Sequence, residues 1–144
     1  MANIFDVAKY ILEKKGQMST WKLQKLCYYS QAWTLAWGGE QLFDEDFQAW
    51  SNGPVCPDLY RQHQGKYMVS DKNFLIGCST NLTPAQTNNI DIVLGDYGDD
   101  DAYQLREQTH SEDPWIVARG ETPSGKRSDA IISKESMGEY YGSL

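Results

Sequence analysis

WKLQKLCYYSQAWTLAW, residues 21–37, is the stretch that decides the fold. It contains neither proline nor glycine, and Leu26, Tyr29, Trp33 and Trp37 recur at the spacing of one helical stripe. Further apolar residues continue around the other sides, and such a helix must be covered on nearly every side. A Gly-Gly pair follows and ends it. The sequence therefore predicts a central helix with the remaining elements packed around it.

Shorter helices are predicted around this central one. Apolar residues over 4–15 follow an amphipathic spacing, with Asn3 as the N-cap. Other helices are expected to start at Pro57, Thr83-Pro84, Asp99–Asp101, Asp113-Pro114 and Ser133. Leu42-Phe43 and Phe47–Trp50 flank an acidic run, which we interpret as a β-hairpin that turns at Asp44-Glu45-Asp46. We expect a mainly α fold: one compact domain over 1–144, with about six helices around the central helix and one small hairpin.

Composition narrows the class of protein. The 144 residues are 40% hydrophobic and 23% charged, which suits a folded domain with a real core. No run of about 18 apolar residues is present, and the first residues lack the pattern of a secretory signal. We therefore expect a cytoplasmic protein with no membrane span. The net charge of −7 and the scattered basic residues disfavour nucleic-acid binding. Such a charge suits a basic protein partner, or simply keeps the protein soluble.

Patterns for metals, cofactors and catalysis are scarce. Cys27, Cys56 and Cys78 are widely spaced, which argues against a disulfide framework and against a structural zinc site. The aspartates over 96–101 lack the ligand spacing of a calcium loop, so we interpret them as helix-capping residues. Phosphate-loop and dinucleotide motifs are absent. We expect no metal and no cofactor. His110 and Glu112 form the one region where acid–base chemistry deserves a test, although hydrogen bonding to helix ends is the favoured interpretation.

Two ordered sets of motif residues run through the chain. The first contains Lys25-Leu26-Cys27-Tyr28, Phe47–Trp50, Gly53-Pro54-Val55 and Leu59-Tyr60. The second contains Thr109-His110-Ser111-Glu112 and Pro114-Trp115, and ends with Tyr140-Tyr141. In this order, and from the first helix almost to Leu144, they resemble the Panacea domain. This is the family of SocA-like or GepA-like proteins of bacteria, phages and prophages.

The resemblance implies a mostly helical fold and the role of an antitoxin. Such a protein is not an enzyme; it binds a protein toxin directly and neutralises it. Members of the family partner with toxins of several unrelated classes, so the resemblance leaves the toxin unidentified. Two alternatives stay open: an adaptor that delivers a toxin to an ATP-dependent protease, and a phage or prophage counter-defence protein. An enzyme that uses His110 and Glu112 is the least favoured alternative.

The partner-binding face is predicted from residue type and position. Tryptophan, tyrosine and arginine are the preferred anchors of protein interfaces. Residues of these types lie at turns and helix ends around the Gly53-Pro54 turn, and we expect them to bind the partner: Trp50, Tyr60, Arg61, Trp115 and Arg119. For any single aromatic residue, packing at the boundary of the core is the competing interpretation.

Overall fold

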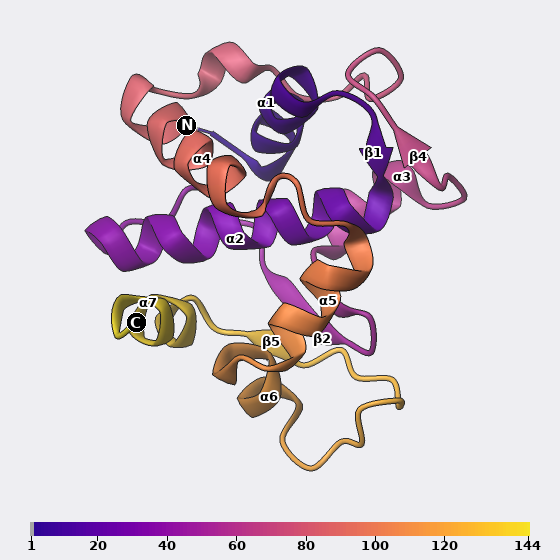
Figure 1. Ribbon diagram of the computed structural model, residues 1–144, viewed down its shortest axis with the longest axis vertical. Coiled ribbons are helices and arrows are strands. Elements are labelled where there is room, and N and C mark those ends of the chain that lie inside the picture. The colour runs from indigo at the N-terminus through magenta and orange to yellow at the C-terminus, as the bar shows by residue number, and fades with distance from the viewer. Residues whose placement is uncertain (1) are drawn as a thin grey trace.

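A computed structural model describes residues 2–144 (Figure 1). The described part holds seven α-helices and five short strands, with a 3-10 turn at Ser79–Asn81. In chain order they are α1 (Ile4–Lys15), β1 (Met18–Ser19), α2 (Thr20–Gly38), β2 (Phe47–Trp50), β3 (Gly53–Val55), α3 (Pro57–His63), β4 (Met68–Val69), α4 (Pro84–Tyr97), α5 (Ala102–His110), α6 (Asp113–Arg119), β5 (Ile131–Ile132) and α7 (Lys134–Gly142). The predicted mainly α fold with a small sheet is confirmed.

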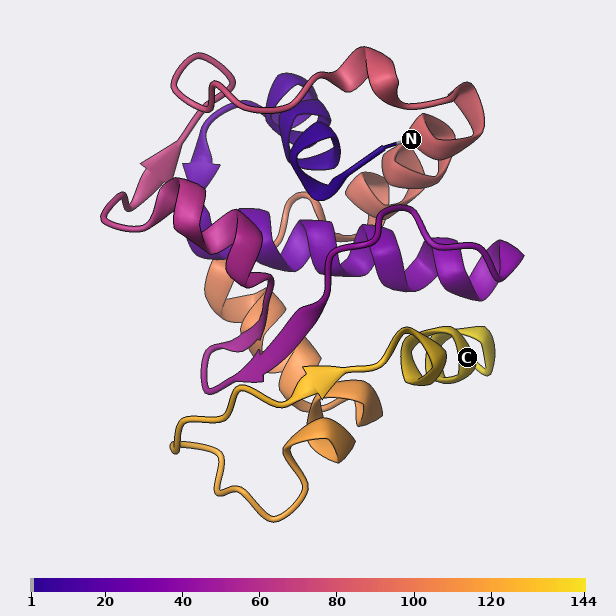
Figure 2. The same cartoon turned by 180° about the vertical axis from the view of Figure 1, so that it is seen from behind.

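Helix α2 lies at the centre of the molecule. Helices α1 and α4 lie on one side of it, and the hairpin, α5, α6 and α7 lie on the other (Figures 1 and 2). Thirteen of its nineteen residues are buried, from several faces of the helix. One residue of the predicted buried stripe departs from the prediction. Trp37 is 46% exposed, because the last turn of α2 extends beyond the elements that cover the rest of the helix.

Polar caps start most of the helices where the sequence predicts them. Asn3 and Asp6 form a reciprocal capping box at α1, and Thr83 and Gln86 form another at α4. Asp101 caps α5 in the same way, while Ser19 and Ser133 cap α2 and α7. The prediction for α6 is wrong by one residue. Asp113 is the first helical residue there, and Glu112 occupies the cap position without a side-chain cap bond.

The hairpin has a different register from the prediction. Its strands are β2 and β3, with Gln48 opposite Val55 and Trp50 opposite Gly53, so it turns at 51–52 and not at the acidic residues. Strand β5 adds a third strand beside β2, which the sequence did not indicate. Strands β1 and β4 pair separately.

Two buried glutamines of α2 explain why the chain around the hairpin takes this course. The Gln31 amide accepts a hydrogen bond from the Leu42 N–H (2.6 Å) and donates one to the Phe43 carbonyl (2.7 Å). Seven residues earlier, Gln24 accepts from the Cys56 N–H (2.9 Å) and donates to the Cys56 carbonyl (3.2 Å). The segments that enter and leave the hairpin are therefore bonded to α2. The Leu42 N–H and the Phe43 carbonyl are thus bonded to α2 and are not available to a strand partner, and neither residue lies in a strand.

Candidate functional site

Three aromatic rings and an arginine gather where α2 begins, β2 ends and α3 passes. Tyr60 lies between two tryptophans, with ring centroids 6.3 Å from Trp21 and 5.1 Å from Trp50. All three rings are half-buried, and Arg61 beside them is exposed and forms an ion pair with Asp58. We call Trp21, Trp50, Tyr60 and Arg61 the aromatic face. Three of its members were predicted to bind the partner. The sequence missed Trp21, because its position in α2 suggested only core packing.

A small pocket adjoins the aromatic face. Its volume is about 230 Å³, and its lining comes from α2, the hairpin turn and α5: Trp21, Lys25, Asn52, Ala102, Tyr103 and Arg106. Tyr103 is 65% exposed, and the Arg106 side chain is partly exposed and ion-paired with the neighbouring Glu107 (3.2 Å). We call this hollow the Lys25 pocket. It places two basic side chains and two aromatic rings together in a chain whose net charge is −7.

Lys25 is the unusual member of this lining. It is 1% exposed, and its buried Nζ has no hydrogen-bond partner among residues 2–144. Nζ lies 5.1 Å from the centre of the Trp21 ring, which is close enough for a cation–π interaction. Burial, and then the nearby positive charge of Arg106, lower the pKa of Lys25 to about 7.

Gly53 explains how a lysine fits at this position. Its φ of +110° is a conformation that other residues rarely adopt. A Cβ atom added there would lie 2.8 Å from Lys25 Cε and 3.1 Å from Thr109 Oγ1. The Lys25 side chain thus occupies the space that a larger residue at position 53 would need. Lys25 and Gly53, two residues of the family motif that lie far apart in the sequence, are therefore parts of one packing arrangement.

Two predicted partner-binding residues, Trp115 and Arg119, lie inside the fold. Each is 5% exposed. The Trp115 indole N–H donates to the Trp50 carbonyl (2.9 Å), and Arg119 donates to the Ala49 and Pro123 carbonyls (2.7 Å each). These bonds fasten α6 and the following loop to β2. In this structure the two residues are buried and have structural contacts, whereas Trp50, Tyr60 and Arg61 are at least partly exposed. Partner binding stays a prediction for all five residues.

Glu112 is the centre of a buried polar network that the sequence did not reveal. Its carboxylate accepts hydrogen bonds from the hydroxyls of Tyr29 and Tyr141 (2.7 Å each) and from the Gln108 amide (3.0 Å). Burial, more than any other cause, raises the pKa of both tyrosines. The network joins α2, α5 and α7 at one carboxylate. Glu112 therefore has a structural role in this fold.

His110 does not form an acid–base pair with Glu112. Its ring stacks on Trp115, with centroids 3.8 Å apart, and its buried Nε2 has no hydrogen-bond partner in the described chain. Burial, and then Arg106, lower its pKa to about 4, so the ring is neutral at pH 7. The carboxylate of Glu112 is bonded to tyrosines instead. The arrangement therefore gives no support to the enzyme alternative.

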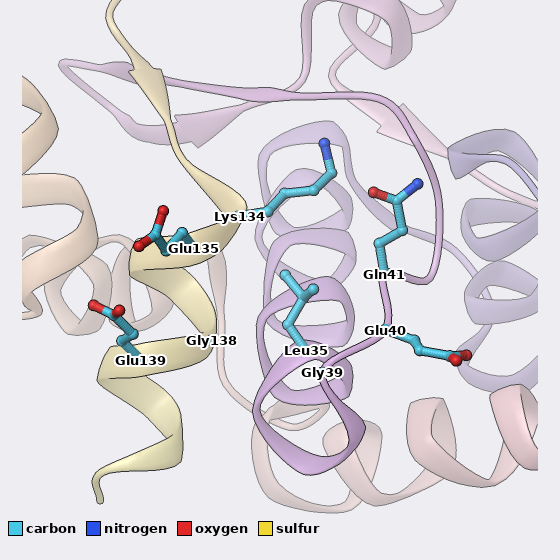
Figure 3. A pocket seen from close by; sticks show the side chains of 8 residues that line it. All are labelled: Leu35, Gly39, Glu40, Gln41, Lys134, Glu135, Gly138 and Glu139. Carbon is cyan, nitrogen blue, oxygen red and sulfur yellow. The ribbon is translucent and has the colours of Figure 1, made fainter.

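A second, wider hollow lies at the other end of α2, against α7 (Figure 3). Its volume is about 720 Å³, and Leu35 and the backbone of Gly39 and Gly138 form part of its lining. Three glutamates and Lys134 surround it, and Lys134 is ion-paired with Asp46 (2.6 Å). Glu135 and Glu139 project from α7 on one side of Leu35, and Glu40 points away on the other (Figure 3). These are solvated carboxylates, and they indicate no ligand by themselves.

Residues 2–144 contain neither a membrane-spanning helix nor a cluster of metal ligands. No helix there is long and apolar enough to cross a membrane. No three His, Cys, Asp or Glu side chains in that range are grouped so that they could hold a metal ion. Of the thiols, Cys27 and Cys56 are buried and Cys78 is exposed.

Comparison with known proteins gives a family. Residues 23–116 match the family described as antitoxin SocA-like, Panacea domain. Antitoxin SocA of Caulobacter vibrioides (strain NA1000 / CB15N) is 32% identical over 130 residues, an alignment that covers 79% of this chain and 69% of that protein. No solved structure matches the chain. The matched range contains Glu112 and every residue of the Lys25 pocket except Trp21, whereas Arg119 and α7 lie beyond it. The chain belongs to the antitoxin SocA-like, Panacea domain family.

Proposed function

We propose that this chain is a non-enzymatic antitoxin that binds a protein toxin directly, in the cytoplasm, and neutralises it. Membership of an antitoxin family supports the role. The observation that supports direct binding is the aromatic face, where accessible rings of Trp21, Trp50 and Tyr60 lie beside Arg61. Half-buried aromatic rings next to arginine are the residue types that carry most of the binding energy at protein interfaces.

Charge favours the same face over the rest of the surface. The chain is acidic overall, yet the pocket that adjoins this face brings together Lys25 and Arg106, and Arg61 follows Tyr60 in α3. A partner that docks here needs an apolar patch for the rings and at least one acidic group for the basic side chains. The acidic hollow beside α7 suits a basic partner instead, but none of the buried, unpaired polar atoms found within residues 2–144 belongs to its lining.

Co-expression with the product of a neighbouring reading frame tests the proposal. The toxicity of that product is scored by growth with and without this chain, and the complex is purified through a tag on one of the two proteins. We expect restored growth and a stoichiometric complex. Absence of both with every neighbouring product would contradict the antitoxin proposal.

Variants locate the binding surface. The double variant Tyr60→Ala, Arg61→Ala removes one ring and one guanidinium from the aromatic face, and we expect it to lose neutralisation while it still folds. Trp37→Ala is the matched control, because Trp37 is an exposed tryptophan at the opposite end of α2. Equal loss in the control, or no loss in the double variant, would place the toxin-binding surface elsewhere.

The adaptor mechanism is an outcome of the same assay. An adaptor protects the cell only while a protease degrades the delivered toxin. Growth is therefore scored again in a host that lacks its ATP-dependent proteases one at a time. Protection that persists in every such host supports direct neutralisation, and protection that disappears in one of them establishes delivery to that protease.

A further inference from the structure

Lys25 has an electrostatic environment without a counter-charge. Its ammonium group is buried, so it has lost its contact with water, and it has no hydrogen-bond partner in the described chain. A buried charge that lacks a partner is strongly unfavourable, and proteins normally pair such groups. The pocket beside it is lined by no acidic residue. The site therefore has the donors of an ion pair and lacks the acceptor.

We propose that the Lys25 pocket binds the carboxylate of an acidic side chain, aspartate or glutamate, that the protein partner inserts beside the aromatic face. This inference rests on the proposed function, since it specifies the chemistry by which the toxin is recognised. Lys25 and Arg106 supply the charged donors, and Trp21 and Tyr103 supply the walls for the methylene groups. A charge-assisted pair formed away from water is stronger and more directional than one at an exposed surface.

None of the groups that face Lys25 is an acid that could act as its counter-charge. Helix α5 contributes Arg106 and His110, helix α3 contributes His63, and burial lowers the pKa of both histidines, so they stay neutral at pH 7. The hairpin contributes the backbone of Gly53. Two acids are next to lining residues in the sequence, and neither lines the pocket: Asp101 caps α5, and Glu107 forms a partly exposed ion pair with Arg106, which a partner's carboxylate would have to replace.

Size favours a single side chain over a free metabolite. Pockets for small-molecule ligands usually measure roughly 300–1,000 Å³, and this one measures about 230 Å³. Continuity with the aromatic face through Trp21, which belongs to both, places the carboxylate at the edge of a protein interface. Nζ is covered in the unbound chain, so binding includes a displacement of a wall. Arg106 can move in this way, because its side chain is 36% exposed and its ion pair is with Glu107, the next residue in the chain.

Acetate is the probe for the pocket in the isolated protein. The ¹³Cε resonances of ¹³C-lysine-labelled protein are followed against pH in sodium acetate and in sodium chloride of equal ionic strength. We expect acetate to raise the pKa of Lys25, whereas the ¹³Cε resonance of Lys22, one turn earlier in α2, should be the same in both salts. Each unit by which the pKa rises corresponds to about tenfold tighter binding of acetate to the charged form of Lys25 than to its neutral form. An identical Lys25 titration in both salts would contradict the proposal.

The complex with the toxin tests the source of the carboxylate. Lys25→Met is compared with Lys22→Met, which removes a lysine that is only half-buried and bonds to the Gly98 carbonyl. We expect Lys25→Met to weaken the complex about thirtyfold or more, as for loss of one member of a buried charge pair. Each acidic residue of the toxin is then changed to its amide. One of these changes should weaken the wild-type complex but add nothing to Lys25→Met.

The outcomes separate this inference from the proposed function. If the toxin binds Lys25→Met as tightly as wild type but fails to bind the Tyr60, Arg61 double variant, the antitoxin proposal stands and the carboxylate inference is wrong. If acetate binds but no toxin carboxylate couples to Lys25, the pocket serves a free carboxylic acid, and the protein source is overturned. If no toxin is found, the antitoxin proposal fails while the acetate titration still decides what the pocket binds.

Discussion

Lys25 and Glu112 are two buried charged residues whose surroundings differ completely. Helix α2 contributes to both sites, through Lys25 itself and through Tyr29 one turn later, which bonds to Glu112. Glu112 accepts three hydrogen bonds from three elements. Lys25 makes none in the described chain and has its pKa lowered to about 7. The two charges are both buried and differ in the number of hydrogen bonds that they make, and the binding role that we propose for Lys25 rests on that difference.

Removal of the Glu112 carboxylate should have the largest effect. Glu112→Ala leaves the hydroxyls of Tyr29 and Tyr141 buried without their acceptor. Hydrogen bonds to a charged group contribute about 1.5–3 kcal/mol each, so we expect the free energy of unfolding to fall by about 3 kcal/mol or more. Urea unfolding measures this. Glu112→Gln keeps one acceptor oxygen and should lose less stability than Glu112→Ala. If Glu112→Ala lost no more stability than Glu112→Gln, the network would not be structural.

Arg119→Met should have the next largest effect. The change removes the donors to the Ala49 and Pro123 carbonyls but keeps most of the side-chain volume over Trp115. We expect a loss of about 2 kcal/mol in the free energy of unfolding, measured in the same way. Arg127→Met, at an exposed arginine of the following loop, is the control and should stay within about 0.5 kcal/mol of wild type. If Arg119→Met were as stable as this control, the bonds of Arg119 to β2 and to the loop would contribute nothing to the fold.

Gly53→Ala tests the packing of Lys25 against the hairpin. The new methyl group combines a strained backbone with a contact of 2.8 Å to Lys25 Cε. Gly65→Ala is the matched control, because Gly65 also has a positive φ (+86°) but has nothing within 4 Å. We expect a loss of about 2 kcal/mol for Gly53→Ala and about 1 kcal/mol for Gly65→Ala. Equal losses would mean that Lys25 moves aside without cost.

Lys25→Met should change stability least at neutral pH, because methionine replaces a buried cation that makes no hydrogen bonds.

The pH dependence of this variant's stability is more informative. Lys25 has an ordinary pKa of 10.5 in the unfolded chain and about 7 in the fold, so between these values the unfolded chain holds the extra proton. The stability of wild type relative to Lys25→Met should therefore rise with pH from about 7 towards 10.5, by at most about 1.4 kcal/mol per pH unit. Below pH 7 the difference should stay constant. A difference that is flat throughout would mean that Lys25 is solvated or paired.

The helices could be predicted from the sequence because the signals that determine them are local. Caps such as Thr83 with Gln86 and the apolar spacing of α2 lie within a few residues of each other, so each predicts its own element. The hairpin register could not be predicted in this way. It depends on the amides of Gln24 and Gln31, which bond to backbone groups more than ten residues along the chain. The extent of the domain, 1–144, stays a prediction.

The candidate site divides in the same way. Residue type was enough to indicate Trp50, Tyr60 and Arg61, since aromatic residues and arginine near a turn are typical of interfaces. It was not enough to separate them from Trp115 and Arg119, which the fold buries against β2. The sequence marks Lys25 only as a residue of the family motif, and it marks Trp21 only as the start of the stretch that forms the central helix.

By itself, the sequence determined the mainly helical class, the central helix, the capped starts of its neighbours and the family. These depend on periodicity, on caps and on motif order, all of which are written along the chain. Only the tertiary structure decided which buried charge is satisfied. Glu112 meets two tyrosines from α2 and α7, while the side chain of Lys25 passes over Gly53 into a pocket with no carboxylate. The physical reason is that desolvation and hydrogen bonding depend on distances between residues that the sequence keeps far apart.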